Sequence, residues 1–389
     1  MSKQKEYVNK LCCGCSACVE VCPTNCINIT SNTEGFYQAY YDPEKCINCK
    51  KCKTICSLNQ IKLNSTKQAY AFVSYDNDIY MRSSSGGVFS HLAIEVLNKG
   101  GYICACGFDS DLRAKHMITK SNNDLDNLRR SKYVQSYIES IFPKIKELLQ
   151  VGEDILFAGT PCQVGALKNY IGVDYENLLT IDLLCHGTPS PEMFFLNKVL
   201  IEKKTSKKLK RYEFRLKSNK HANCYICTYI FDDGQIIEKP FYDDPYFCEF
   251  YNNDSLNECC YRCPYATADR VGDITIGDFA WVKEVIHDFD NFDEISCIMI
   301  NTAAGEKQVE NLKKCGILVP CTIDDIKKKN FTLINPTERP KYREKIYDEI
   351  NSLGYEKWAQ KFFFSKQHLR HHDAVNKIKK VFLMIHKGK

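Results

Sequence analysis

Two stretches of the sequence, CCGCSACVEVCP at residues 12–23 and CINCKKCKTICS at residues 46–57, decide the fold of the N-terminal region. Both follow the spacing C-x2-C-x2-C-x3-C, so they form an internal repeat, with Pro23 after the first run and Ser57 after the second. Three thiolates spaced two residues apart on a tight loop can reach three corners of one iron-sulfur cubane, and the fourth cysteine of each run ligates the other cluster. The repeat therefore predicts a ferredoxin-type domain at residues 1–62 that holds two neighbouring 4Fe-4S clusters.

This crossed arrangement assigns every cysteine of the two runs to a cluster. We expect one cluster on Cys12, Cys15, Cys18 and Cys56, and the other on Cys46, Cys49, Cys52 and Cys22. Zinc is the alternative, but zinc sites usually use two separated ligand pairs and not tandem runs of four cysteines. Two further cysteines, Cys13 and Cys26, fall outside the spacing and are expected to be spare thiols packed near the clusters.

The length and composition of the chain indicate that this domain is a small part of the protein. The chain has 389 residues, 44% hydrophobic and 26% charged, which leaves room for two or three globular domains. It has twenty-three cysteines, no secretion signal and no apolar run that could span a bilayer, so we expect a cytoplasmic protein whose cysteines are thiols or metal ligands. The net charge of +5 is spread along the chain, and nucleic acid is not an expected partner.

The body of the chain alternates strands and helices, which predicts an α/β fold with a mostly parallel or mixed sheet. A Ser-Gly turn at residues 83–87 leads into a helix from Val88, where free backbone N–H groups beside the helix dipole suit a phosphate. An ordinary N-capped helix is the alternative. Further helices are expected from Gln163 and Pro191, and strands at residues 69–74, 102–106, 154–158, 178–184 and 224–231.

Two of these strands end in turns that carry cysteine, Cys162 and Cys185. Because strands and helices alternate, we expect the two strands to be parallel neighbours whose turns meet at the carboxyl edge of the sheet. A C-x2-C pair in a loop before an expected strand at residues 273–277 completes four possible ligands: Cys162, Cys185, Cys260 and Cys263. A third 4Fe-4S cluster, a zinc site and unligated thiols are the alternatives for this set. His186, beside Cys185, is a candidate proton relay, although a lone histidine is more often structural.

Several motifs of the body resemble, in the same order, those of the beta subunit of coenzyme F420-reducing hydrogenases and dehydrogenases. The matching strings are SSSGGVFSHLA from Ser83, SKYVQS from Ser131, GTPCQVGALK from Gly159, DLLCHGTPSP from Asp182, CYRCPYA from Cys260 and DITIGDF from Asp273. The resemblance covers roughly residues 68–330. It divides the body into an N-terminal region at residues 68–145 and a C-terminal region at residues 146–335.

The resemblance implies a flavoprotein in which FAD lies beside a 4Fe-4S cluster and exchanges a hydride with a soluble carrier, so the four body cysteines are expected to hold a third cluster. By position it implies flavin contacts at Ser84, Ser85, Gly86, Gly87, Lys132, Tyr133, Gln135 and Thr160. We expect an iron-sulfur flavoprotein oxidoreductase that passes electrons between a hydride carrier and a redox partner. The alternatives are an electron-transfer subunit without a hydride site of its own and, less favoured, a zinc-stapled interaction protein.

The C-terminal segment, residues 336–389, is expected to be a helical basic tail. Its last part, residues 366–389, has seven Lys and Arg residues against a single acid, Asp373, and its apolar residues fall at helical spacing. An amphipathic helix of this kind could touch a membrane surface or a partner. A solvated terminal helix is the more common outcome for such a segment.

Overall fold

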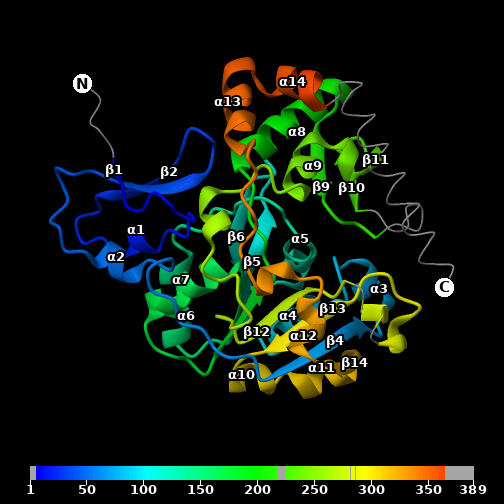
Figure 1. The fold of residues 1–389 in the computed structure, drawn as a ribbon. Helices are drawn as coiled ribbons and strands as arrows, with labels where there is room; N and C mark the ends of the chain where they lie inside the picture. Colours follow the sequence, from blue (N-terminus) through cyan, green and yellow to red (C-terminus); the bar gives the residue numbers. More distant parts are fainter. Residues whose placement is uncertain (1–5, 218–224, 281, 285, 364–389) are drawn as a thin grey trace.

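The structure is a computed structural model that describes residues 6–217, 225–280, 282–284 and 286–363 (Figure 1). The expected basic helix at residues 366–389 lies outside these described residues. The N-terminal domain consists of an antiparallel sheet of order β1-β3-β2 and two short helices. Its elements are β1 (Glu6–Tyr7), α1 (Ala17–Glu20), β2 (Ile27–Ser31), β3 (Tyr37–Tyr41) and α2 (Lys51–Ile55).

The two cysteine runs adopt the same backbone conformation, so the repeat in the sequence is also a repeat in the structure. Gly14 and Asn48, at equivalent positions, have φ angles of 73° and 54°, and Ser16 and Lys50 have φ angles of 64° and 61°. Left-handed backbone at two residues out of three bends each run tightly before its short helix begins. This bend draws the first three thiols of each run toward one centre.

The body is built on an eight-stranded mixed sheet of order β14-β4-β13-β12-β8-β7-β5-β6. Strands β4, β12, β8, β7 and β5 run in one direction, and β14, β13 and β6 run in the other. The strands are β4 (Gln68–Ser74), β5 (Tyr102–Phe108), β6 (Ala114–Thr119), β7 (Ile155–Gly159), β8 (Leu178–Leu183), β12 (Ile274–Asp278), β13 (Ser296–Ile300) and β14 (Gly316–Cys321). The expected α/β class and mixed sheet are confirmed, as is the parallel pairing of β7 with β8.

Helices cover both faces of this sheet because its strands are apolar on both sides. In β7, Leu156 and Ala158 face one core, while Ile155 and Phe157 face the other. The first core is covered by α4 (Val88–Asn98), α5 (Leu125–Leu128) and α11 (Val309–Cys315). The second core is covered by α6 (Ile141–Gln150) and α7 (Pro161–Ile171), and α12 (Ile323–Lys327) packs near the β14 end of the same face.

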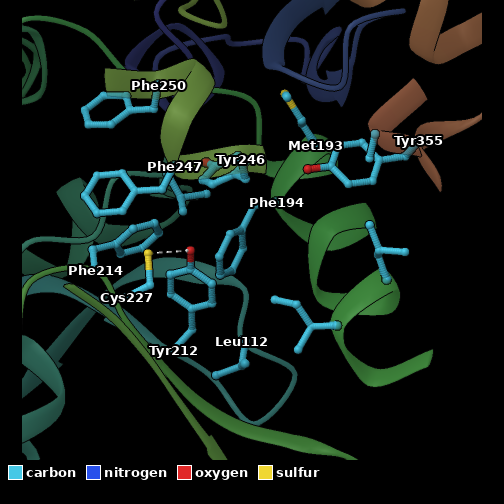
Figure 2. Close-up of a cluster of buried hydrophobic side chains, with 14 of the residues drawn as sticks. Leu112, Met193, Phe194, Tyr212, Phe214, Cys227, Tyr246, Phe247, Phe250 and Tyr355 are labelled. Atoms are coloured by element: carbon cyan, nitrogen blue, oxygen red, sulfur yellow. Dashed lines mark hydrogen bonds between the residues drawn. The ribbon is translucent and has the colours of Figure 1, made fainter. Parts of the chain in front are cut away.

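A third unit, which the sequence analysis did not identify, packs beside the body sheet at the top of Figure 1. Its antiparallel sheet of order β11-β10-β9 is covered by helices from two distant parts of the chain. Its elements are α8 (Pro191–Thr205), β9 (Leu209–Glu213), β10 (Ile226–Phe231), β11 (Ile236–Pro240), α9 (Pro245–Tyr251), α13 (Arg343–Leu353) and α14 (Tyr355–Trp358). Figure 2 shows its aromatic core, in which the Tyr212 hydroxyl lies 3.5 Å from the Cys227 thiol.

One carboxyl group of this unit makes its stability depend on pH. Burial, reinforced by the nearby carboxylate of Asp254, raises the pKa of Glu249 to about 8. The folded protein therefore keeps a proton that the unfolded chain releases near pH 4.3. The free energy of unfolding falls as the pH rises from about 4.3 to about 8, by at most about 1.4 kcal/mol per pH unit.

Replacing Glu249 with glutamine is expected to remove this dependence of the free energy of unfolding on pH and to raise the free energy of unfolding at pH 8. Denaturant unfolding at pH 6, 7 and 8 measures the slope of the free energy against pH. Glu176, which is exposed, provides the matched control, and its change to glutamine should leave the slope intact. An E249Q slope equal to that of the parent protein would contradict the prediction.

Details of three predicted elements differ from expectation. Helix α7 begins at Pro161 and not near Gln163, because Thr160 and Gln163 form a capping box and proline suits the first helical position. The expected loop at Cys260 contains a short 3-10 helix, η3 (Glu258–Arg262). The proposed boundary at residue 146 falls between β6 and β7, which belong to one sheet.

Among the described helices, none is both long and apolar enough to cross a membrane.

Candidate functional site

A small cavity in the N-terminal domain is lined by the four thiols of the first predicted cluster and by two further cysteines, Cys13 and Cys52. Cys56 and Cys52 come from the second run, and the other cysteines come from the first. Burial, with the charges of Cys15 and Cys56 as further causes, raises the pKa of Cys12 to about 12. Thiolates this crowded need a cationic centre to stay charged, which is what iron supplies. Cys56 thus lies beside the first run, but Cys52 lines the same cavity, so the crossed assignment stays a prediction.

The second set lies nearer the surface of the same domain. Cys49 is exposed, and Cys46 and Cys52 are half-buried. Cys22, from the first run, contacts the spare thiol Cys26 at 3.4 Å between the sulfur atoms, and Cys26 is itself a neighbour of Cys46. Cys22 is thus connected to the second run only through Cys26, and its assignment to the second cluster stays a prediction.

A much larger cavity, of about 290 Å³, opens at the carboxyl edge of the body sheet. Its walls come from the residues that follow or end the parallel strands β4, β5, β7, β8 and β12, and from β6. Ligands of open α/β sheets bind at this edge, and the volume is close to the lower end of the usual range for small-molecule sites, roughly 300–1,000 Å³. All four cysteines of the predicted third cluster line this cavity: Cys162, Cys185, Cys260 and Cys263.

The register of the sheet explains why two of these thiols meet. Gly159 in β7 pairs with Asp182 in β8, and Cys162 and Cys185 each lie three residues beyond the paired position. Burial first, and then the charges of Cys260 and Cys263, raise the pKa of the Cys185 thiol to about 12. The pKa of Cys162 is likewise raised, in part by Cys263 and Cys185. The four thiols therefore interact electrostatically as one group.

A buried ion pair fixes the Cys260–Cys263 segment against the end of β8. The Arg270 guanidinium donates to Asp182 Oδ2 at 2.8 Å, and both side chains are almost fully buried. The same guanidinium donates to the carbonyl oxygens of Tyr265 and Thr267, which follow Cys263, and to that of Leu183, which ends β8. Arg270 thereby connects two of the chain segments that carry cluster cysteines.

No group of three or more His, Cys, Asp or Glu side chains in the described residues is arranged around a single metal ion. In the N-terminal cavity and in the larger one, the cysteines instead surround a space. A cubane, which is larger than one ion, needs ligands that are spread in this way.

The polar end of the large cavity contains unpaired hydrogen-bond donors. Helix α4 begins at Gly87 without a side-chain cap, and its first-turn residues line the cavity. Ser85 Oγ and Arg129 Nη1, also from lining residues, are buried without hydrogen-bond partners. The Arg129 guanidinium forms an ion pair with Asp126 at 3.7 Å through Nε, but its Nη1 has no hydrogen-bond partner. A helix N-terminus beside such a donor suits the pyrophosphate of a dinucleotide. The cavity therefore fits FAD at its phosphate end.

Seven of the eight predicted flavin contacts line the cavity, and Gly86 does not. Gly86 packs on β4, where a Cβ atom would lie 2.0 Å from the carbonyl oxygen of Phe72, so the fold itself requires glycine there. Lys132 donates to the carbonyl oxygens of Arg129 and Arg130, and burial lowers its pKa to about 8. Tyr133 stacks on Phe250 with ring centroids 4.5 Å apart.

Gln135 has another task that the sequence did not reveal. Its amide oxygen accepts from the Tyr37 N–H at 2.7 Å, and its amide nitrogen donates to the carbonyl oxygens of Cys13 and Tyr37 at 3.1 Å. The side chain thus connects the body to the N-terminal domain. These bonds engage both amide hydrogens, so the side chain has no donor left for a flavin.

His186 lines the cavity but is poorly suited to proton transfer. Its ring stacks on Phe250 at 4.7 Å between centroids, and burial lowers its pKa to about 4. The imidazole is therefore neutral at physiological pH. This environment favours the structural alternative that the sequence analysis gave for His186.

Sequence reasoning also missed a buried hydrogen-bond chain behind Cys162. His116 Nδ1 pairs with Ser136 Oγ at 3.0 Å, Gln163 Nε2 donates to the same oxygen at 2.8 Å, and Gln163 Oε1 accepts from Thr160. Thr160 Oγ1 lies 3.1 Å from Cys162 Sγ. Arg129 could have been noticed beside the SKYVQS motif, whereas His116 gave no local signal.

Comparisons with known proteins give two family matches. Residues 152–326 match the family described as the C terminus of the coenzyme F420 hydrogenase/dehydrogenase beta subunit, and residues 11–59 match the 4Fe-4S dicluster domain. The search of curated proteins gives no match. Among solved structures, the chain is similar to one from the F420-reducing nickel-iron hydrogenase complex of Methanosarcina barkeri, with 16% identity and a TM-score of 0.45 over 73% of this chain and 99% of that one.

The paired cysteine runs, together with the dicluster match, define an iron-sulfur electron-transfer protein. Its body is a mixed α/β fold, and the matched residues 152–326 span β7 to α12. Residues 152–326 thus form a C-terminal domain of the coenzyme F420 hydrogenase/dehydrogenase beta-subunit family, and residues 11–59 form a 4Fe-4S dicluster domain.

Proposed function

We propose that this chain is a flavin-dependent oxidoreductase that exchanges electrons between a small-molecule hydride carrier and a redox partner protein. FAD would bind in the large cavity, and a third 4Fe-4S cluster would be held by Cys162, Cys185, Cys260 and Cys263. One observation carries the proposal: a single cavity is lined both by the predicted flavin contacts and by all four of these cysteines. A flavin and a cluster bound there would be direct neighbours.

The chain's own residues would hold FAD through charge and stacking. The α4 N-terminus, Ser85 and Arg129 would bind the pyrophosphate, because their donors lack partners. Tyr133 and Phe250 supply an aromatic part of the cavity lining. When bound, FAD accepts a hydride, which is two electrons with a proton, and gives up electrons singly to carriers such as 4Fe-4S clusters.

Arg215, which lines the large cavity, and Lys217 hold the Ser-Gly loop through its carbonyl oxygens. Lys217 Nζ donates to the carbonyl oxygens of Tyr80, Ser83 and Ser85 at 2.6 to 2.8 Å. Arg215 donates to the Ser84 carbonyl oxygen at 3.1 Å and pairs with Asp278 and Glu294. Because the Arg215 and Lys217 side chains bind its carbonyl oxygens, the loop is held in one conformation, and the α4 N-terminus stays directed at the cavity.

The second candidate is an electron-transfer subunit that has no hydride site. It is favoured by the exposed face around Cys49, where lysines and one apolar side chain could dock an acidic partner: Lys45, Ile47, Lys50, Lys51 and Lys53. Both candidates use the N-terminal clusters. They differ in whether the large cavity binds a flavin.

Anaerobic reconstitution of the full chain, followed by iron, sulfide and flavin assays, tests the proposal. We expect about twelve irons, four for each of three clusters, and one FAD per chain. Replacing Cys185 with alanine should lower the iron content to about eight. As the matched control, Cys321→Ala, in β14 and away from the cavity, should leave it unchanged. A parent protein with about eight irons and no flavin would contradict the proposed function.

A further inference from the structure

The two cysteines outside the ligand spacing, Cys13 and Cys26, occupy different places in the structure. Cys26 is buried inside the N-terminal domain, against Cys22 and near Cys46 of the second set. Cys13 faces the body. Although both residues were expected to be spare thiols, only Cys13 lies where the two halves of the molecule meet.

Cys13 lines both cavities at once. It belongs to the wall of the small cavity of the first cluster and to the wall of the large cavity that contains the third set of cysteines. Its thiol lies 3.8 Å from Ser57 Oγ, which in turn lies 3.9 Å from the thiol of Cys15, a predicted ligand of the first cluster. It also interacts electrostatically with Cys162, a predicted ligand of the third cluster, which lines the large cavity with it. One side chain therefore lies between ligands of both sites.

The body fixes the backbone around Cys13. Gln135 donates to the Cys13 carbonyl oxygen at 3.1 Å, and Asn257 donates to that of Cys12 at 3.3 Å. The Tyr265 hydroxyl donates to the Ser57 carbonyl oxygen at 2.7 Å. Gly14 has a φ of 73°, and a Cβ atom there would lie 2.6 Å from the Gln135 amide nitrogen, so the approach is closer than any other residue permits.

We propose that Cys13 is a positioning residue at the electron junction between the third cluster and the N-terminal pair. The set Cys12, Cys15, Cys18 and Cys56 is then the inner cluster, and the set with the exposed Cys49 is the outlet to the partner. Single electrons cross the junction, so one cluster is oxidised as its neighbour is reduced and no bond forms or breaks. The inference rests on the proposed third cluster.

The order of reduction tests this proposal in the reconstituted full chain. Oxidised protein is mixed with dithionite and frozen at successive times, and EPR follows each cluster, with the signals assigned beforehand from Cys49→Ala and Cys185→Ala. Dithionite meets the exposed outlet cluster first. We therefore expect the EPR signal of the outlet cluster to appear first, then that of the inner cluster, and then that of the third cluster.

In C13A the third signal should be delayed about tenfold or more, since removing an outer-shell partner of a metal ligand commonly costs about 10- to 100-fold. Its iron content should match that of the parent. C13S, which retains a hydrogen-bonding group, should restore much of the rate. C26A, the matched control, should behave like the parent protein.

Three results would overturn the proposal. If the EPR signal of the third cluster appears as early in C13A as in the parent protein, the thiol is not at the junction. If C13A loses about four irons, Cys13 is a cluster ligand. If the EPR signal of the third cluster appears before that of the inner cluster, the proposed order of electron transfer is wrong. A parent protein with only about eight irons would instead remove the third cluster, and with it the proposed function.

Discussion

Replacing Arg270 with alanine is expected to lower the free energy of unfolding by about 3–5 kcal/mol, since it removes the ion-pair partner of a carboxyl group, Asp182, that is buried in the core. Arg270 is 2% exposed and Asp182 is 0% exposed, so water cannot replace the lost partner. Denaturant unfolding of the anaerobic protein measures the loss. The same change should also reduce iron content, because Arg270 connects the Cys260–Cys263 segment to the end of β8.

Arg262 provides the matched control for this experiment. It lies between Cys260 and Cys263 but is exposed, so its replacement by alanine should change stability by less than about 0.5 kcal/mol. The double variant R270A/D182N should recover part of the loss, because the unpaired charge is removed with its partner. An R270A loss no larger than that of R262A would contradict the role of the ion pair.

Replacing Arg343 with alanine is expected to cost about 3 kcal/mol, at the lower end of the range for a broken buried pair because the Glu34 side chain keeps some contact with water. Arg343 is fully buried at the start of α13, and its two terminal nitrogens bind the two carboxylate oxygens of Glu34 at 2.7 Å. Glu34 lies in the N-terminal domain, between β2 and β3. The loss should therefore loosen the attachment of that domain to the rest of the chain.

Limited proteolysis measures this loosening, and denaturant unfolding measures the free energy. R343A should release an N-terminal fragment faster than the parent protein does. Arg339 is the matched control: it pairs with Glu258 and Glu344 in the same segment but makes no contact with Glu34. If R339A releases the fragment as fast as R343A, the Arg343–Glu34 pair does not hold the domain in place.

The two ion pairs have a common consequence for electron transfer. Arg270 arranges the ligands of the proposed third cluster, and Arg343 keeps the N-terminal domain docked beside them. Electron transfer between clusters depends on their separation, so both arginines would affect activity although neither lines the large cavity. Neither residue stands out in the sequence, because each acts on a partner that is far away in the chain.

Local patterns in the sequence were sufficient to predict the elements that carry the cysteines. The C-x2-C spacing, the apolar strands before Cys162 and Cys185, and the Ser-Gly turn before α4 are all short-range signals, and the structure contains each of these elements. The β9–β11 unit was missed because its core joins α8 and α9 to α13 and α14, which lie about a hundred residues further along. A pattern within one segment cannot reveal such a contact.

The roles of individual polar residues show the same limit. Position within a motif suggested Gln135 as a flavin contact, but its amide holds the N-terminal domain. Gly86 was expected to be a flavin contact, yet the carbonyl oxygen of Phe72 is what excludes a side chain there. Arg129 acquires its meaning only because α5 places its guanidinium in the cavity wall without a hydrogen-bond partner.

The sequence by itself determined that the chain has a dicluster ferredoxin domain and an α/β body, because ligand spacing and strand periodicity are local properties of a polypeptide. Only the tertiary structure decided which thiols face one another. The register of β7 with β8 brings Cys162 to Cys185. Docking of the N-terminal domain places Cys13 at the wall of the large cavity, whereas Cys26 stays inside the domain against Cys22. Distances across the interface follow from packing between segments far apart in the chain, and no spacing rule encodes them.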